Sequence, residues 1–316
     1  MPSFTPLSRV AVVCYTMMAL IAFAANSVLA RMALSSDNTA TLIDPSSFTV
    51  IRLASGAIVL GAIMLLMPST SSKPAVAHAS NLASLLLFIY AITFSYAYVL
   101  LDTATGALIL FAAVQISMML ISYIQGHRLN QLEILGALVA FGGFGYLVWP
   151  SVGVTNGELS ITGMVLMVIS GCAWGGYTLL GKGATRPLFT TGVNFILTLP
   201  LVLLMILTVW LIQVFTPVEN NISVQLSGKG VLLAILSGGL ASSIGYALWY
   251  QALRGLHSTQ AAVLQLSVPI IAALGGVIFV GEQLSVHLIM CASIILFGIS
   301  LVILTKPKST IKKEVL

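Results

Sequence analysis

The sequence predicts an all-α polytopic membrane protein, in which ten transmembrane helices form two inverted five-helix repeats around a central cavity. Three observations lead to this prediction. The chain of 316 residues is 59% hydrophobic and only 7% charged, whereas soluble domains are about 25% charged. Its apolar runs are long enough to cross a bilayer. An internal repeat relates its two halves. Lipid is therefore the expected solvent for most of the protein surface.

Each predicted span is an apolar run of about 20 residues, the length that a helix needs to cross the hydrocarbon core. The runs are 10–30, 46–67, 82–101, 104–125, 132–149, 161–182, 188–215, 230–252, 258–280 and 286–304. The run 188–215 is longer than one span requires and contains Pro200. We therefore expect this helix to be kinked at the proline or tilted in the bilayer.

The repeat appears when the stretch 281–284 is shifted back by 155 positions (281 − 126), which places its Gly-Glu-Gln-Leu on the Gly-His-Arg-Leu of 126–129. The same shift aligns the polar turn 257–260 with 102–105. Each copy holds an odd number of spans, so the second is expected to be inverted, with a binding site where the copies meet near mid-depth. The predicted units are a first repeat at 1–150, a linker at 151–160, a second repeat at 161–305 and a basic tail at 306–316.

Charge placement predicts the orientation. With the N-terminus on the cytoplasmic side, ten of the 13 Lys and Arg residues fall on that side; Arg31 and Lys229 fall outside, and Arg52 lies within a span. Cytoplasmic loops carry the excess of positive charge in membrane proteins. We therefore expect the chain in the cell membrane, inner or plasma, with both termini cytoplasmic.

Several motifs together resemble those of one protein family. They are Trp174-Gly175-Gly176-Tyr177 with Lys182, Asp44-Pro45 with Arg52, Tyr250-Gln251-Ala252-Leu253 with the helix start at 258–262, Pro269, and Gly281-Glu282. On these residues the chain resembles the drug/metabolite transporter superfamily, in its ten-helix, EamA-type form. The first half departs from the family pattern. Phe23 stands at the usual tryptophan position, and Val114-Gln115 and Gly126-His127 stand where a mid-helix proline and then Gly-Glu are frequent.

The resemblance implies a secondary transporter for amino acids and other small metabolites. It also implies a basket of helices in which the first, third, fourth, sixth, eighth and ninth line a central cavity. We expect a small-molecule substrate and the lipid bilayer as partners and no nucleic acid. Coupling to a proton or ion, and the choice between monomer and homodimer, stay open. An uncoupled facilitator or a channel is the alternative, and an intramembrane enzyme is less favoured because no GxSxG or HExxH motif is present.

Arg52 is the least expected residue in a membrane span, about 9 Å into its helix at 1.5 Å per residue. One interpretation is structural: the arginine snorkels to the outer headgroups or pairs with Asp44. The other is functional: it provides a positive charge that attracts or holds a carboxylate. Arg31, near the outer end of the first helix, belongs either to the same patch or to the helix terminus alone.

Two amides lie near the middle of predicted spans, Gln115 and Gln265. A buried amide needs a hydrogen-bond partner, on a neighbouring helix or on a ligand. Pro269 removes the helical donor for the carbonyl of Gln265, so we expect a kink there. Both glutamines are candidates either for helix association or for lining the cavity.

Aromatic residues supply the remaining candidates for the cavity wall, with membrane-interface packing as the alternative. Tyr246, Trp249 and Tyr250 share one helix face, and Trp174 and Tyr177 share another. Asn26 and Tyr98 are the candidates from the first copy. The full predicted substrate site is Asn26, Arg52, Tyr98, Gln115, Trp174, Tyr177, Tyr246, Trp249, Tyr250 and Gln265, with Pro200 and Pro269 as hinges.

The sequence predicts neither cofactor nor metal. Cys14, Cys172 and Cys291 lie in apolar runs without metal-ligand spacing, so we expect them to be small buried packing residues without disulfides. No Asp or Glu lies deep within a predicted span. A proton relay through buried carboxylates is therefore not indicated.

Overall fold

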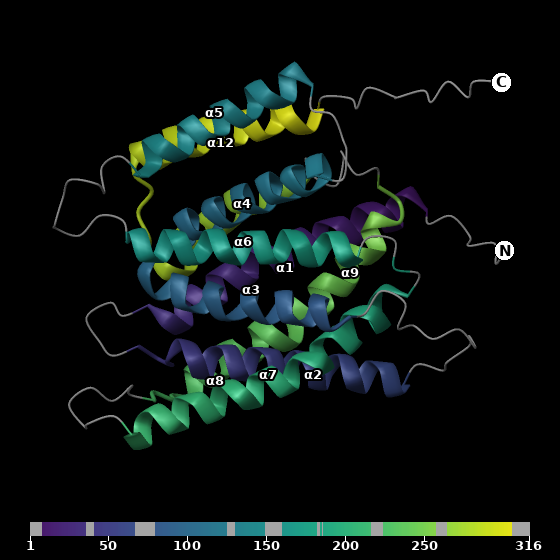
Figure 1. Ribbon diagram of the computed structural model, residues 1–316, viewed down its shortest axis with the longest axis vertical. Coiled ribbons are helices and arrows are strands. Elements are labelled where there is room, and N and C mark those ends of the chain that lie inside the picture. Colours follow the sequence, from purple (N-terminus) through teal and green to yellow (C-terminus); the bar gives the residue numbers. More distant parts are fainter. Residues whose placement is uncertain are drawn as a thin grey trace.

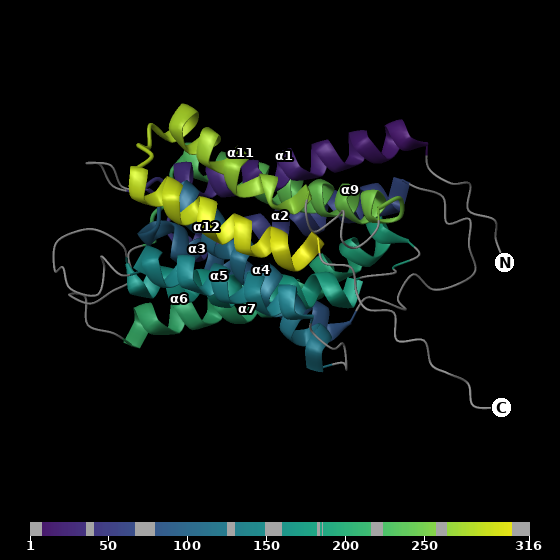
Figure 2. The same ribbon diagram turned by 90° about the horizontal axis from the view of Figure 1, so that it is seen from above.

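The computed structural model describes residues 8–35, 41–66, 80–124, 130–148, 160–181, 184, 186–215, 224–256 and 264–304. Within these ranges the regular structure is helical, apart from one isolated antiparallel bridge between Ile43 and Leu226. The all-helical prediction is thus confirmed for the described part of the chain. The helices run roughly along one common direction in both views (Figures 1 and 2).

The element bounds follow the predicted runs to within a few residues at most ends. The helices are α1 (Arg9–Leu34), α2 (Pro45–Leu66), α3 (Asn81–Leu100), α4 (Thr103–Ile124), α5 (Gln131–Val148), α6 (Ile161–Gly181), α7 (Pro187–Phe215), α8 (Gly228–Ile235), η4 (Leu236–Ser242), α9 (Ser243–Leu253), α11 (Ser267–Gly275), η5 (Gly276–Val280) and α12 (Val286–Leu304). Most of the predicted linker (151–159), Lys182 and the tail 306–316 lie outside the described residues.

Seven helical segments of the described chain are long and apolar enough to cross a membrane, with α8, η4 and α9 counted as one segment, Gly228–Leu253. Shorter apolar helices occupy Gln131–Gly143, Ser267–Val280 and Val286–Leu301. Large apolar side chains are exposed along these helices; Leu65 is 89% and Phe215 81% exposed. A surface of this kind is stable in lipid, which solvates it, and unstable in water.

The two halves of the chain contribute helices of opposite direction. An added Cβ at Gly163, at the start of α6, would meet Leu101. Arg31, near the end of α1, bonds to the next residue, Asp102. The start of α6 and the end of α1 therefore lie at the same end of the bundle. Hence α1 and α6 run antiparallel.

Other pairs of helices, one from each half of the chain, are also antiparallel. Gly192 near the start of α7 lies beside Met64 near the end of α2. The start of α8 contacts Ile43, just before α2. The last part of α3 lies at the same end of the bundle, because Tyr96 contacts Ser46 at the start of α2. The α11–η5 segment ends beside Thr103, the first residue of α4. α5 and α12 also pack in opposite directions.

The central part of the bundle holds α1, α3, α4, α6, α9 and α11, which pack on one another. Figure 1 shows α5 and α12 side by side at one edge, where they contact mainly each other and α4. In Figure 2, α1 lies alongside α11 and α9. The buried core therefore lies between helices from both halves of the chain.

Two departures from regular α-helix fall in the second half. Leu236–Ser242 and Gly276–Val280 are π-helical, a geometry that is frequent at functional sites. A turn at Leu266 interrupts the helix between Gln265 and Ser267, close to the kink predicted from Pro269. By contrast, α7 continues through Pro200.

The expectation for the cysteines was wrong in part. Cys291 is buried, but Cys14 and Cys172 are exposed on the apolar surface. All three are free thiols. Their small, weakly polar side chains are compatible with a lipid-facing position as well as with a core, so position within an apolar run did not decide burial.

Candidate functional site

A small hollow lies at the centre of the bundle, between the two halves of the chain. It is lined by Phe23, Asn26 and Ser27 of α1, Tyr90 and Phe94 of α3, Leu110 and Phe111 of α4, Trp174 of α6 and Tyr246 of α9. Of the spans that the family resemblance implies, the ninth (258–280, which holds α11 and η5) contributes no described residue to this lining. In this conformation the hollow has room for about one water molecule.

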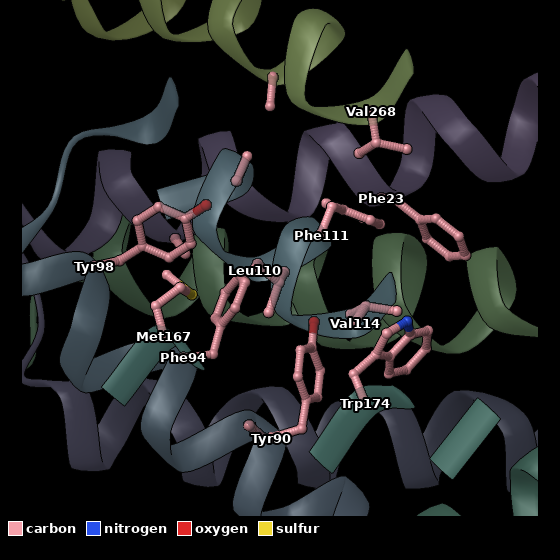
Figure 3. Packing of buried hydrophobic residues seen from close by; sticks show 14 of the residues in the cluster. Phe23, Tyr90, Phe94, Tyr98, Leu110, Phe111, Val114, Met167, Trp174 and Val268 are labelled. Atoms are coloured by element: carbon pink, nitrogen blue, oxygen red, sulfur yellow. The ribbon is translucent and has the colours of Figure 1, made fainter. Parts of the chain in front are cut away.

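Aromatic rings form most of the wall. The Trp174 ring lies 4.4 Å from that of Tyr246, 5.0 Å from Tyr90 and 6.0 Å from Phe23, between ring centroids. Figure 3 shows Tyr90, Phe94 and Trp174 directed toward the same space as Phe23 and Phe111. Such tilted and edge-to-face contacts hold the rings in fixed orientations. The wall is therefore an ordered aromatic surface.

Arg52 lies directly behind this wall and is only 1% exposed. Its Nη2 donates hydrogen bonds to the hydroxyls of Tyr90 (2.9 Å) and Tyr246 (3.2 Å), and its Nε to Ser242 Oγ (3.1 Å). The guanidinium carbon lies 4.5 Å from the centroid of the Phe94 ring, a cation–π geometry. The structural interpretation of Arg52 is thus not borne out, since the side chain neither reaches the surface nor pairs with Asp44.

Asp44 is used differently. Its Oδ1 accepts from the backbone N–H of Ser47 (2.9 Å) and its Oδ2 from that of Gln225 (3.2 Å). A carboxylate just before the first turn of a helix satisfies free backbone N–H groups there and interacts favourably with the helix dipole. Asp44 therefore caps α2 and attaches the segment before α8 to it.

The π-helical segment η4 completes the polar side of the site. Ser237 Oγ donates to Asn26 Oδ1 at 2.5 Å, and the amide of Asn26 donates to the Tyr90 hydroxyl at 3.2 Å. Gly238 lies so close to α2 that an added Cβ would collide with the carbonyl oxygen of Arg52. The absence of a side chain at Gly238 thus lets η4 bring its serines against Asn26 and Arg52.

A second polar cluster joins several helices at the end of the bundle where α1 finishes. Arg31 forms ion pairs with Asp102 (3.1 Å) and Glu282 (3.3 Å). Glu282 also accepts from the backbone N–H of Thr103 at 2.8 Å and 3.0 Å, and from its hydroxyl at 2.9 Å. The cluster connects α1, the N-terminus of α4 and the segment after η5. We call Arg31, Asp102, Thr103 and Glu282 the end cluster.

The structure brings together part of the predicted site. Asn26, Trp174 and Tyr246 line the hollow, and Arg52 bonds to two of its lining residues. Tyr98, Tyr177, Trp249 and Tyr250 form a second layer, with ring contacts to Phe94, Trp174, Phe23 and Tyr177 respectively.

The two glutamines meet each other rather than the hollow. Gln115 Nε2 lies 3.5 Å from Gln265 Oε1, a long hydrogen bond between α4 and the segment just before α11. The Nε2 of Gln265 has no partner among the described residues. This contact joins the two halves of the chain, as expected for amides that promote helix association.

Sequence reasoning missed several lining residues, above all Tyr90 and Phe94. A signal was present: Tyr90, Phe94 and Tyr98 recur every four residues on one face of α3. Phe23 was noted only as a departure from the family pattern. The hydroxyls of Ser237 and Ser242 gave no signal, because their approach to Asn26 and Arg52 depends on the π-helical backbone of η4.

The fold and the site together define a polytopic membrane protein with a polar site buried between its helices. Residues 161–304 match the EamA-like transporter family. A relative from Pseudomonas aeruginosa, "Uncharacterized protein PA1977", is 42% identical over 91% of this chain and 93% of its own length. The Bacillus subtilis "Uncharacterized transporter YwfM" is 27% identical over 49% of each chain. The chain belongs to the EamA-like transporter family, and the family resemblance is confirmed.

A solved crystal structure shares the fold. Its chain is 20% identical to this one and superposes with a TM-score of 0.59, covering 93% of this chain and 98% of that chain. It is the family match, and not this likeness of fold, that makes the protein a membrane transporter; the EamA-like family is a family of transporters and not of enzymes.

Proposed function

We propose that the protein is a secondary transporter that exports small amphipathic metabolites, such as amino acids and related compounds, by alternating access. The observation that carries this proposal is the central hollow, to which both halves of the chain contribute. Its wall is aromatic on several sides and polar at Asn26, Ser27 and the Tyr90 and Tyr246 hydroxyls. A surface of this kind suits a ligand with an apolar body and a polar group.

The antiparallel relation of corresponding helices supports two inverted five-helix repeats, 1–150 and 161–305, with ten crossings in all. In inverted-repeat transporters the substrate site lies where the repeats meet, and one repeat rocks against the other. The hollow supports a site of this kind, because it lies between α1, α3 and α4 of the first half and α6 and α9 of the second.

The end cluster supports the proposal that the site opens to one side of the membrane at a time. On the predicted orientation, with both termini cytoplasmic, Arg31 and Glu282 lie at the outer end. Their ion pair and the bonds from Glu282 to Thr103 tie helices of the two halves together. We propose that this cluster is the outer gate and that it opens when the site faces outward.

Counterflow in proteoliposomes tests the proposal. Vesicles preloaded with one metabolite at a time would be given a trace of the same labelled metabolite outside, with and without a pH gradient. A carrier shows saturable, transient accumulation of label above equilibrium. If none of a broad panel of amino acids and related amphipathic solutes produces such accumulation, the proposal is wrong.

An uncoupled facilitator is the second candidate. It is favoured by the composition of the hollow, whose described lining contains no Asp or Glu to carry a proton. The same vesicles separate the two candidates. Coupled export responds to an imposed pH or ion gradient, whereas a facilitator shows counterflow that no gradient alters. A channel shows flux without saturation and without counterflow.

A further inference from the structure

Among the described residues, Arg52 is a buried charge without a counter-charge. Arg31 forms two ion pairs, and Arg52 takes part in neither. The hydrogen-bond partners of Arg52 are three neutral hydroxyls, and its Nη1 has no partner among the described residues. An arginine remains protonated in proteins, so the positive charge is present in the folded state. An unpaired buried charge is costly unless an anion compensates it.

The acidic side chains of the described residues are engaged elsewhere. Asp44 lies eight residues earlier on the chain, about 12 Å along a helix at 1.5 Å per residue, and caps α2. Asp102 and Glu282 bind Arg31 at the end of the bundle. The charge of Arg52 is therefore left for something that is not part of the described chain.

The hydrogen-bond network around Arg52 also has more donors than acceptors. The Tyr90 hydroxyl accepts from Arg52 Nη2 (2.9 Å), from Tyr246 (3.1 Å) and from Asn26 Nδ2 (3.2 Å). A hydroxyl oxygen has two lone pairs and one proton to donate. Three donors therefore compete for two lone pairs. A ligand that accepts hydrogen bonds would take up the surplus donor.

This network opens into the hollow. Asn26, Tyr90 and Tyr246 all line it, and Arg52 stands directly behind the two tyrosine hydroxyls. The rest of the wall is apolar, with Phe23, Phe94, Leu110, Phe111 and Trp174. Figure 3 shows the hydroxyl of Tyr90 pointing into the space between Leu110, Phe111 and Trp174.

We propose that the hollow, widened in another conformation of the transport cycle, binds a monocarboxylate anion with an apolar body. The carboxylate accepts hydrogen bonds from the Tyr90 and Tyr246 hydroxyls, and Arg52 balances its charge; the body lies against the aromatic wall. The described lining holds no acidic side chain to receive an ammonium group, so the site prefers monocarboxylates to amino acids of the same shape. This inference rests on the proposed transport function and narrows its substrate class.

Matched probes test the charge requirement. The purified full-length protein in nanodiscs would be titrated by calorimetry at neutral pH with 4-methylpentanoate, with its neutral amide 4-methylpentanamide, and with leucine, which adds only an ammonium group. Empty nanodiscs correct for partition into lipid. We expect the amide to bind about 30-fold more weakly than the acid, and leucine about tenfold more weakly because its ammonium is left unpaired.

Variants assign the preference to Arg52. Arg52→Gln should abolish the difference between acid and amide, and Arg52→Lys should restore part of it. Tyr90→Phe keeps the ring and removes the hydroxyl, so it should weaken the acid about tenfold and leave the amide nearly unchanged. Arg186→Gln is the matched control, since Arg186 stacks on Phe189 away from the hollow, and its preference should equal that of the wild type.

The outcomes separate this inference from the transport proposal. Equal binding of acid and amide to the wild type, or an unchanged preference in Tyr90→Phe and Arg52→Gln, would overturn the carboxylate site even if counterflow of other solutes succeeds. Leucine binding as tightly as the acid would overturn the preference over amino acids. Conversely, tight binding of the acid without counterflow of any solute would uphold the site and contradict transport.

Discussion

Removing the charge of Glu282 should loosen the predicted outer gate. The Glu282 side chain is only 10% exposed, and it bonds both to Arg31 and to the first residue of α4, Thr103. In Glu282→Gln the amide oxygen still accepts a hydrogen bond, but the charge is lost. This costs about 1 kcal/mol in the bond to Arg31 and about 1 kcal/mol at the positive N-terminus of α4. About 2 kcal/mol corresponds to a roughly 30-fold shift toward the open gate.

A cysteine in the hollow reports this shift. Ser27 lines the hollow one turn before Arg31, so Ser27→Cys is protected while the gate is closed. The native thiols Cys14, Cys172 and Cys291 would first be replaced by serine. The rate of modification by a membrane-impermeant thiol reagent, added on the outer side, then measures the fraction of open gates. We expect this rate to rise up to about 30-fold in Glu282→Gln.

Asp102→Asn is the matched control. Asp102 pairs with the same arginine at 3.1 Å, but its side chain is 60% exposed, and ion pairs exposed to solvent contribute about 0–1 kcal/mol. In Asp102→Asn, the modification rate of the cysteine at position 27 should therefore change only a few-fold. If Asp102→Asn raises the rate as much as Glu282→Gln, or if Glu282→Gln leaves the rate unchanged, the assignment of Glu282 to the gate is wrong.

Further predictions concern packing and the aromatic wall. Gly238→Ala should lower the free energy of unfolding by about 1–3 kcal/mol, because its Cβ would collide with the Arg52 carbonyl. Gly61→Ala, where an added Cβ meets nothing within 4 Å, should not destabilise, and thermal melting compares the two. Trp174→Ala should reduce counterflow at least about tenfold, whereas Trp210→Ala, at a tryptophan that is 54% exposed, should leave it unchanged. If the two glycine variants are equally destabilised, or if the two tryptophan variants lose counterflow equally, the packing described is wrong.

The helices were predictable because lipid restricts what an apolar chain can do. Every backbone group within the hydrocarbon region must be bonded internally, so an apolar run of about 20 residues becomes a helix. The predicted run 46–67 corresponds to Pro45–Leu66 and the run 82–101 to Asn81–Leu100. The interruption at Leu266 was also expected approximately, since Pro269 cannot donate to the carbonyl of Gln265.

The π-helical segments were not predictable in this way. Their hydrogen bonds differ by one residue from those of an α-helix, and the apolar run 230–252 gives no indication of the change. Close packing of Gly238 on α2 accompanies it, and this contact depends on a helix far away in the sequence. The serines that reach Asn26 and Arg52 could therefore not be assigned to the site beforehand.

The environment of Arg52 was only half predictable. The sequence showed that the arginine lies within a span and offered Asp44 as a partner two turns away. It could not show that Asp44 would cap α2, nor that Tyr90 and Tyr246 would converge on the guanidinium. These tyrosines come from different halves of the chain, so their meeting depends on the tertiary structure.

The most direct measurement of alternating access is the two-sided accessibility of a single cysteine at position 27. In oriented vesicles, Ser27→Cys would be exposed to an impermeant thiol reagent from either face, with and without a transported solute. Alternating access predicts modification from each face in turn, from one face when an outward solute gradient is imposed and from the other when the gradient is reversed. Modification from only one face under all conditions, or from both faces at once with unsaturable flux, would contradict it.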